Sequence, residues 1–129
     1  MAHTTIHICM DEPLRNLSLT ISGLLAIAAG VTHGVLGETK VFARAQITPS
    51  GARRLIRAVW LFGVVSWIAI AVLMIAAPHL GSQDARHWII ATSAVTYAFG
   101  AVGNAIVTRG KHFGWMLLLV VSGLAVAGW

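Results

Sequence analysis

The stretch Ala58–Ala77, AVWLFGVVSWIAIAVLMIAA, is twenty residues long and contains no charged side chain. Its apolar residues run continuously and do not alternate with polar ones, which indicates a helix and not a half-buried strand. A helix needs about 20 apolar residues to cross the roughly 30 Å hydrocarbon core of a bilayer. The stretch therefore predicts a transmembrane helix.

The rest of the chain has the same character. Of its 129 residues, 57% are hydrophobic and 10% are charged, and the mean hydropathy is +0.81. We predict one all-α domain, an integral membrane bundle of four antiparallel transmembrane helices. The expected helices cover about residues 17–37, 58–77, 88–107 and 113–129, after a polar N-terminal leader at residues 1–16.

The basic residues are distributed unevenly around these helices. Seven Lys and Arg residues lie in or beside the first and third connections, and only Arg15 and Arg86 lie on the other side. Positively charged loops stay in the cytoplasm, so this bias predicts a multi-pass protein of the bacterial inner membrane with both termini outside. The net charge of +5 is too dispersed to form a basic face, which argues against a nucleic-acid partner.

The first apolar stretch ends with AGVTHGVLGE, residues 29–38, and includes a stripe of small residues. Ala26, Gly30, Gly34 and Gly37 recur about one turn apart, and Gly100 lies on a similar face of the third helix. Small residues let helix backbones approach closely in lipid. We expect these positions to pack against another helix of this chain or of a partner.

His33 lies within that stretch, where an unpartnered imidazole is costly. One interpretation is an interfacial histidine that bonds a helix or water. Another is an axial ligand of a tetrapyrrole, either haem or a chlorophyll-type pigment, since Ala29, Gly30 and Gly34 leave room beside it and light-harvesting polypeptides have a similar A-x-x-x-H arrangement. Contact with a quinone or a proton relay is a third interpretation.

Two further polar groupings are predicted. Glu38, at the end of the first helix, is expected to form a salt bridge with a basic residue at the start of the second, where the candidates are Arg53, Arg54 and Arg57. On the third helix, Tyr97 and Asn104 share a polar face whose default role is to bond neighbouring helices. The sharper hypothesis is a ligand pocket lined by Tyr97 and Asn104 and completed by Ser66 and His33.

We predict no metal site. The leader contains four residues of types that bind copper, namely His3, His7, Cys9 and Met10. A chain terminus without supporting contacts would bind the metal only loosely.

The chain resembles a group of short, uncharacterised bacterial membrane proteins with four predicted helices. Their pattern is H-x-x-x-G-E at the end of the first helix, an Arg-rich entry to a Trp in the second, and a basic-His-x-Gly-Trp turn before the fourth. The matching residues here are His33, Gly37, Glu38, Arg53, Arg54, Trp60, Lys111, His112, Gly114 and Trp115. The group often has a second His after the helix-two Trp, where this chain has Leu61. The resemblance implies fold and membrane placement, and it implies no activity.

No arrangement of nucleophile, base and orienting group is visible, which argues against an enzyme. The leading hypothesis is a small non-enzymatic subunit or assembly factor of a larger redox, respiratory or photosynthetic membrane complex, or a homo-oligomer. The first alternative is a tetrapyrrole- or quinone-binding electron-transfer module that uses His33. The second alternative is a small transporter.

Overall fold

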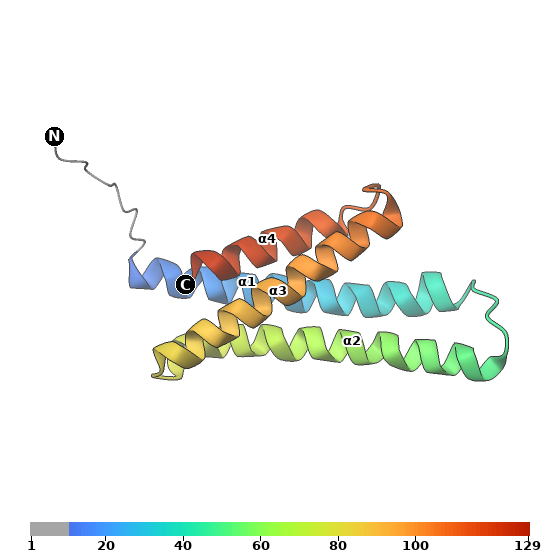
Figure 1. The fold of residues 1–129 in the computed structure, drawn as a ribbon, viewed down its shortest axis with the longest axis horizontal. Helices are drawn as coiled ribbons and strands as arrows, with labels where there is room; N and C mark the ends of the chain where they lie inside the picture. Colours follow the sequence, from blue (N-terminus) through green and yellow to red (C-terminus); the bar gives the residue numbers. More distant parts are fainter. Residues whose placement is uncertain (1–10) are drawn as a thin grey trace.

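The structure is a computed structural model and describes residues 11–129 (Figure 1). It contains four α-helices: α1 (Glu12–Leu36), α2 (Ser50–Ala76), α3 (Gln83–Thr108) and α4 (Gly114–Ala127). A π-helix, η1 (Gly37–Phe42), continues α1, and a short 3-10 turn, η2 (Ala77–His79), follows α2. The prediction of an all-α chain with four helices is confirmed.

Three of the four helices start before their apolar stretches do. α1 begins at Glu12 and not at residue 17, with Pro13 in its first turn, where proline is well tolerated. α2 begins at Ser50 and not at residue 58. Hydropathy marks the part of a helix that suits lipid, and polar residues such as Arg53 extend the helix beyond that part. Residues 12–16 of the predicted leader therefore belong to α1, and its candidate copper ligands lie outside the described residues.

Helix length and composition agree with membrane insertion. The helical segments Glu12–Phe42, Ser50–His79 and Gln83–Thr108 are long and apolar enough to cross a bilayer. α4 is apolar but has 14 residues, which correspond to about 21 Å at 1.5 Å per residue.

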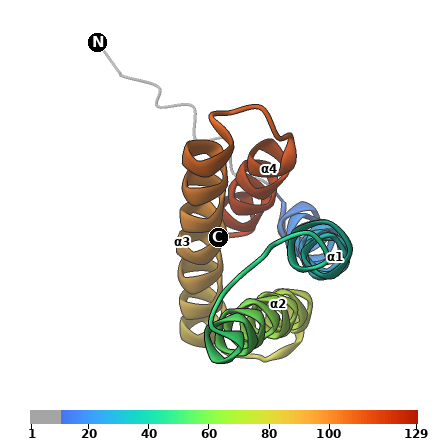
Figure 2. The same cartoon turned by 90° about the vertical axis from the view of Figure 1, so that its right-hand side faces the viewer.

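α1 lies between α2 and α4, and the closest pairings are α1 with α2 and α3 with α4 (Figures 1 and 2). α3 runs obliquely, from beside the end of α2 to the loop that precedes α4 (Figure 2). The main core uses small residues at the helix crossings, as expected where packing and not water exclusion holds helices together. It consists of Ala26, Ala71, Met74, Tyr97, Ala101, Leu118, Val121 and Ala125.

Hydroxyl groups connect the helices through backbone carbonyls. Ser22 Oγ donates to the carbonyl of Val121 at 2.7 Å, and Ser122 Oγ donates to the carbonyl of Ala94 at 3.0 Å. These bonds link α1 to α4 and α4 to α3, so small polar side chains fix the helix arrangement inside an otherwise apolar interior.

Candidate functional site

The imidazole of His33, on the last turns of α1, stacks against two tryptophans of α2. Its ring centroid is 4.1 Å from that of Trp60 with an interplanar angle of 9°, and 5.2 Å from that of Trp67 with an angle of 29°. The two tryptophans are about two turns apart on one face of α2, so the imidazole fits between them. Its ring plane is therefore fixed by α2.

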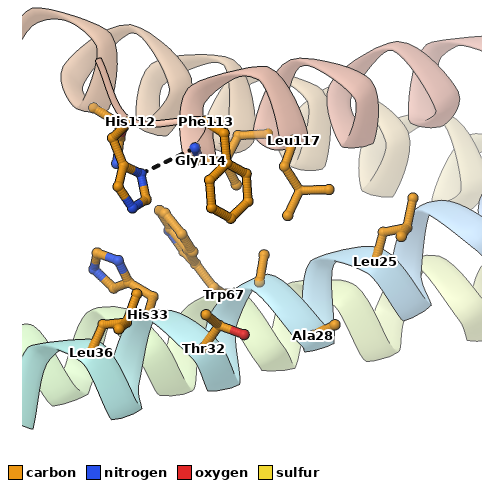
Figure 3. Close-up of a pocket in the computed structure, with 13 residues that line it drawn as sticks. Leu25, Ala28, Thr32, His33, Leu36, Trp67, His112, Phe113, Gly114 and Leu117 are labelled. Carbon is orange, nitrogen blue, oxygen red and sulfur yellow. Dashed lines mark hydrogen bonds between the residues drawn. The ribbon is translucent and has the colours of Figure 1, made fainter. Parts of the chain in front are cut away.

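A cavity of about 150 Å³ opens beside this imidazole. Figure 3 shows His33 and His112 pointing toward each other from opposite walls at one end, and Leu25 at the other end. The cavity is polar near the loops and apolar deeper in the bundle. All four helices or their adjoining loops contribute to its lining: Leu25, Ala28, Ala29, Thr32, His33, Leu36, Trp67, Asn104, His112, Phe113, Gly114, Leu117 and Leu118.

His112 precedes α4 and has a defined hydrogen-bonding state. Its Nδ1 accepts the backbone N–H of Gly114 at 3.1 Å (Figure 3). A neutral imidazole whose Nδ1 accepts a hydrogen bond carries its proton on Nε2. The second ring nitrogen of His112 is thus a hydrogen-bond donor.

Asn104, on α3, supplies a polar group at the same corner. Its Oδ1 is buried and has no hydrogen-bonding partner among the described residues. A Cβ added to Gly114 would lie 2.8 Å from His112 Nδ1 and 3.6 Å from Asn104 Nδ2, so both side chains meet at this glycine. An unpaired buried acceptor is unfavourable, particularly in lipid.

The other predicted pocket residues lie elsewhere. Tyr97 is fully buried in the core, where its hydroxyl donates to the carbonyl of Trp67 at 2.7 Å. Ser66 is half-buried and does not line the cavity. Of the four residues in the pocket hypothesis, the structure brings only His33 and Asn104 to the cavity, and Tyr97 instead supports the backbone of Trp67.

The small-residue stripe of α1 faces α2. Ala26, Gly30 and Gly37 are buried, and Gly34 is half-buried. A Cβ on Gly30 would lie 3.1 Å from Ile68, and one on Gly34 would lie 3.3 Å from Val64.

Two further glycines of the predicted packing set contact tryptophans. A Cβ on Gly37 would overlap the indole nitrogen of Trp60, and one on Gly100 would lie 2.8 Å from Trp67. The four glycines of the predicted packing set are therefore used inside the chain, and the α1 stripe is not a free docking surface.

Glu38 forms its salt bridge with Arg57. Nη2 of Arg57 is 2.6 Å from Oε2, and Nε donates to Oε1 at 2.9 Å. Arg53 instead donates to the backbone carbonyl of Phe42 at 2.6 Å, and Arg54 is exposed. Two of the three candidate arginines therefore hold η1 against the start of α2.

Sequence reasoning missed two contributors to this arrangement. His112 is far from His33 in the sequence, so the sequence gives no signal that the two imidazoles lie close together. Trp67 lies in the middle of an apolar stretch and carries no signal of a site either, although it borders both the cavity and His33. The H-x-G-W turn before α4 is the signal that could have placed His112 at a defined site.

The described residues contain no group of three or more His, Cys, Asp or Glu side chains placed to hold a metal ion. No family model matches the chain, and no curated protein or solved structure matches it either. The function must therefore be argued from the site itself.

Proposed function

We propose that this chain is a multi-pass protein of the bacterial inner membrane, with four antiparallel crossings and both termini outside. Three spans long and apolar enough to cross a bilayer support membrane insertion. The cluster of basic residues around the η1–α2 and α3–α4 connections supports their cytoplasmic placement. A C-terminal alkaline phosphatase fusion should be active, and a C-terminal cytoplasmic reporter should be silent. The reverse pattern would refute the orientation.

We further propose that the protein binds a small, planar, lipid-soluble molecule in the cavity beside His33. The observation that carries this proposal is the pair of imidazoles, His33 and His112, on opposite walls of a cavity that is otherwise mostly apolar. Such a lining suits a ligand with a polar headgroup and an apolar body. The imidazole of His33 forms no hydrogen bond with another described residue, so it is available to a ligand.

Size and hydrogen bonding favour a single-ring headgroup over a tetrapyrrole. A volume of about 150 Å³ is one at which an apolar protein cavity accepts benzene. A tetrapyrrole, with four linked rings, is larger than this cavity. In addition, a bis-histidine arrangement needs an unprotonated Nε2 on His112, whereas its Nδ1 already accepts a hydrogen bond. For a ligand-binding module that uses His33, a quinone-sized molecule is therefore better supported than a tetrapyrrole.

The transporter alternative receives less support. Proton-coupled transport across a membrane commonly uses an ionisable residue inside the bundle. The chain has four carboxylate side chains. Asp11 and Glu12 lie at the start of α1, Asp84 at the start of α3, and Glu38 in η1. All four carboxylates lie at helix ends, so none is placed for a relay at the bilayer centre.

An accessory role in a larger membrane complex is the second candidate, and the outer face of α3 favours it. Val95 and Phe99 are 70% and 80% exposed, and they border a groove of about 460 Å³ that includes Gly100 and Gly103. A transmembrane helix of a partner could pack there beside Gly103, since no heavy atom of the described residues lies within 4 Å of a Cβ added to it. Migration of the protein only as a monomer after gentle solubilisation of native membranes would refute this role.

The ligand-binding function is tested on protein purified from its native membrane in mild detergent. We expect an organic extract of the wild-type protein to contain a lipid-soluble aromatic molecule at a near-stoichiometric level, and the extract of His33→Leu to lack it. His79→Leu is the matched control, since this exposed histidine lies in η2, outside the cavity. Equal extracts from wild type and His33→Leu would overturn the proposal. An absorption spectrum of the same sample would reveal a pigment or haem.

A further inference from the structure

We infer that the basic surface at the η1–α2 connection binds the headgroups of anionic phospholipids. This surface consists of three exposed side chains, Lys40, Arg44 and Arg54. Lipid binding there rests on the membrane insertion proposed above and is independent of any ligand in the cavity. Its grounds are the charge of these side chains, their lack of internal partners and their depth in the bilayer.

Charge is distributed unequally between the two ends of the bundle. The end with the η1–α2 and α3–α4 connections holds seven Lys and Arg residues and one carboxylate, that of Glu38. The opposite end, where α1 and α3 begin, holds two arginines and the other three carboxylates (Figure 1). Anions are therefore attracted to the first end and not to the second.

Contacts within the chain use only part of this positive charge. Arg57 forms its salt bridge with Glu38, and Arg53 donates to the carbonyl of Phe42 at 2.6 Å. The three side chains of the basic surface form no salt bridge with any described residue. Their charges are therefore available to an anion outside the protein.

The first turns of α2 lie at the depth of the lipid headgroups. The uncharged stretch Ala58–Ala77 matches the hydrocarbon core, which is about 30 Å thick and has a headgroup layer of about 5–8 Å on each side. Arg54 precedes Ala58 by four residues, so it lies about 6 Å further along the helix axis. This position is inside the headgroup layer, where the phosphates are.

Two contacts bring η1 to the same depth. The salt bridge of Arg57 and the hydrogen bond of Arg53 hold η1 alongside the first turns of α2. Lys40 lies in η1 between the two residues that receive these contacts, so it is close in depth to Arg54. Arg44 follows two residues after the end of η1, and its long side chain can extend back toward the headgroup layer.

Exposed apolar side chains beside the basic surface favour a lipid over an acidic protein segment. Leu61 and Val65 lie two and three turns after Arg54 on the same face of α2, and they are 41% and 66% exposed. One phospholipid can therefore place its acyl chain on this face and its phosphate at Arg54. Lys and Arg bind phosphate through charge-assisted hydrogen bonds, and basic clusters beside transmembrane helices attract anionic lipids.

The test measures which lipids associate with the protein in a bilayer. Protein is reconstituted in phosphatidylcholine vesicles with a trace of spin-labelled phosphatidylglycerol or of spin-labelled phosphatidylcholine with the same acyl chains. Electron paramagnetic resonance gives the fraction of each label that is immobilised at the protein. A basic side chain near a charged headgroup contributes up to about a fivefold change in binding, so we expect wild type to prefer phosphatidylglycerol by about three- to tenfold at low salt. In about 1 M salt this preference should shrink, because salt screens exposed charges.

A pair of triple variants tests the basic surface directly. Replacement of Lys40, Arg44 and Arg54 by glutamine should reduce the preference to below about twofold. The variant with Lys40→Arg, Arg44→Lys and Arg54→Lys keeps the charges and should keep the preference. An unchanged immobilised fraction of labelled phosphatidylcholine shows that each variant is still folded in the bilayer.

A second pair of variants tests the surface through a gain of binding. Glu38→Gln releases Arg57 and should raise the preference for phosphatidylglycerol. Asp84→Asn changes the net charge by the same amount at the opposite end and should leave the preference unchanged, because the guanidinium of Arg86 there is already bound to Gly128 and Asn16. An equal rise in both variants would show an effect of net charge alone and would overturn the inference.

The remaining outcomes separate lipid binding from membrane insertion. Equal association of the two labelled lipids with wild type, or a preference that the glutamine variant retains, would overturn the lipid assignment while insertion stands. Equal association would leave an acidic segment of a partner protein as the candidate for this surface. If neither label is immobilised, membrane insertion itself is refuted, and lipid binding is refuted with it. Both leaflets of the vesicles have the same composition, so the result does not depend on the orientation that the reporter fusions test.

Discussion

The guanidinium of Arg86, on α3, binds the backbone carbonyl of Gly128 at the end of α4. Nη2 donates to this oxygen at 2.7 Å and Nε at 3.2 Å, and Nη1 donates to Asn16 Oδ1, on α1, at 2.6 Å. The residue is only 4% exposed. The last carbonyls of a helix have no partner within it, and a cation there is favourable. Arg86 thus joins three helices at one end of the bundle.

We predict that Arg86→Ala destabilises the protein by about 2–4 kcal/mol, because three hydrogen bonds to a charged group are lost and their buried acceptors are left unpaired. Thermal unfolding in detergent measures the loss. Arg54→Ala, at an exposed position of α2, is the control and should change stability by no more than about 0.5 kcal/mol. Equal midpoints for the two variants would show that Arg86 does not hold the helices together.

The different treatment of Arg86 by sequence and by structure has a physical reason. In the sequence, Arg86 contributes only to the count of basic residues that predicts the membrane topology, since an arginine near a helix start is normally solvated. Its partners Asn16 and Gly128 are distant in the chain, and a backbone carbonyl carries no sequence signal. Periodicity and hydropathy report what a single helix needs, and so they predicted the helices but not the contacts between their ends.

The same reasoning applies to the candidate site. His33 could be singled out because an imidazole in an apolar helix needs a partner. Asn104 could be grouped with Tyr97 because both lie on the polar face of α3. In the structure, however, Tyr97 lies in the core and Asn104 lines the cavity, because α3 runs obliquely across its neighbours (Figure 2). That crossing depends on packing among all four helices, so the sequence pattern alone could not assign Asn104 to the cavity and Tyr97 to the core.

Gly23 lets α1 lie very close to the backbone of α2, so a larger side chain there should push the two helices apart. A Cβ at this position would lie 2.8 Å from the carbonyl oxygen of Ala71 and 2.5 Å from Ile75 Cγ1. The backbone oxygen cannot move aside cheaply, so we expect Gly23→Ala to destabilise the protein by about 1–3 kcal/mol. Detergent thermostability measures the change.

Gly63, in α2, is the matched control for that substitution. No heavy atom of the described residues lies within 4 Å of a Cβ added there, beyond its own helical surroundings. Gly63→Ala should therefore leave stability unchanged or raise it by up to about 1 kcal/mol, since alanine favours a helix over glycine. A stabilising effect of both substitutions would mean that α1 and α2 are further apart than the structure places them.

The Glu38–Arg57 pair should make a small contribution to stability. The two side chains are 32% and 56% exposed, and exposed ion pairs contribute little to stability because water screens them. We expect Glu38→Gln to lower the unfolding midpoint slightly at low salt and less at high salt, because salt screens the pair. Unfolding measured in about 20 mM and about 1 M salt tests this, and a large loss of stability that is equal at both concentrations would contradict the surface character of the pair.

The Tyr97→Phe variant tests whether the hydroxyl of Tyr97 stabilises the bundle or binds the ligand. Its hydroxyl is buried and bonded to the carbonyl of Trp67, and it does not line the cavity. Removal of the hydroxyl in Tyr97→Phe leaves that carbonyl with only its bond within α2, so we expect a loss of about 0.5–1.5 kcal/mol of stability. The organic extract of Tyr97→Phe should contain the same lipid-soluble molecule as the extract of wild type, since the ring still packs against Trp67. Unchanged stability together with loss of that molecule would place the hydroxyl of Tyr97 in the ligand site and would require a different arrangement of α3 around the cavity.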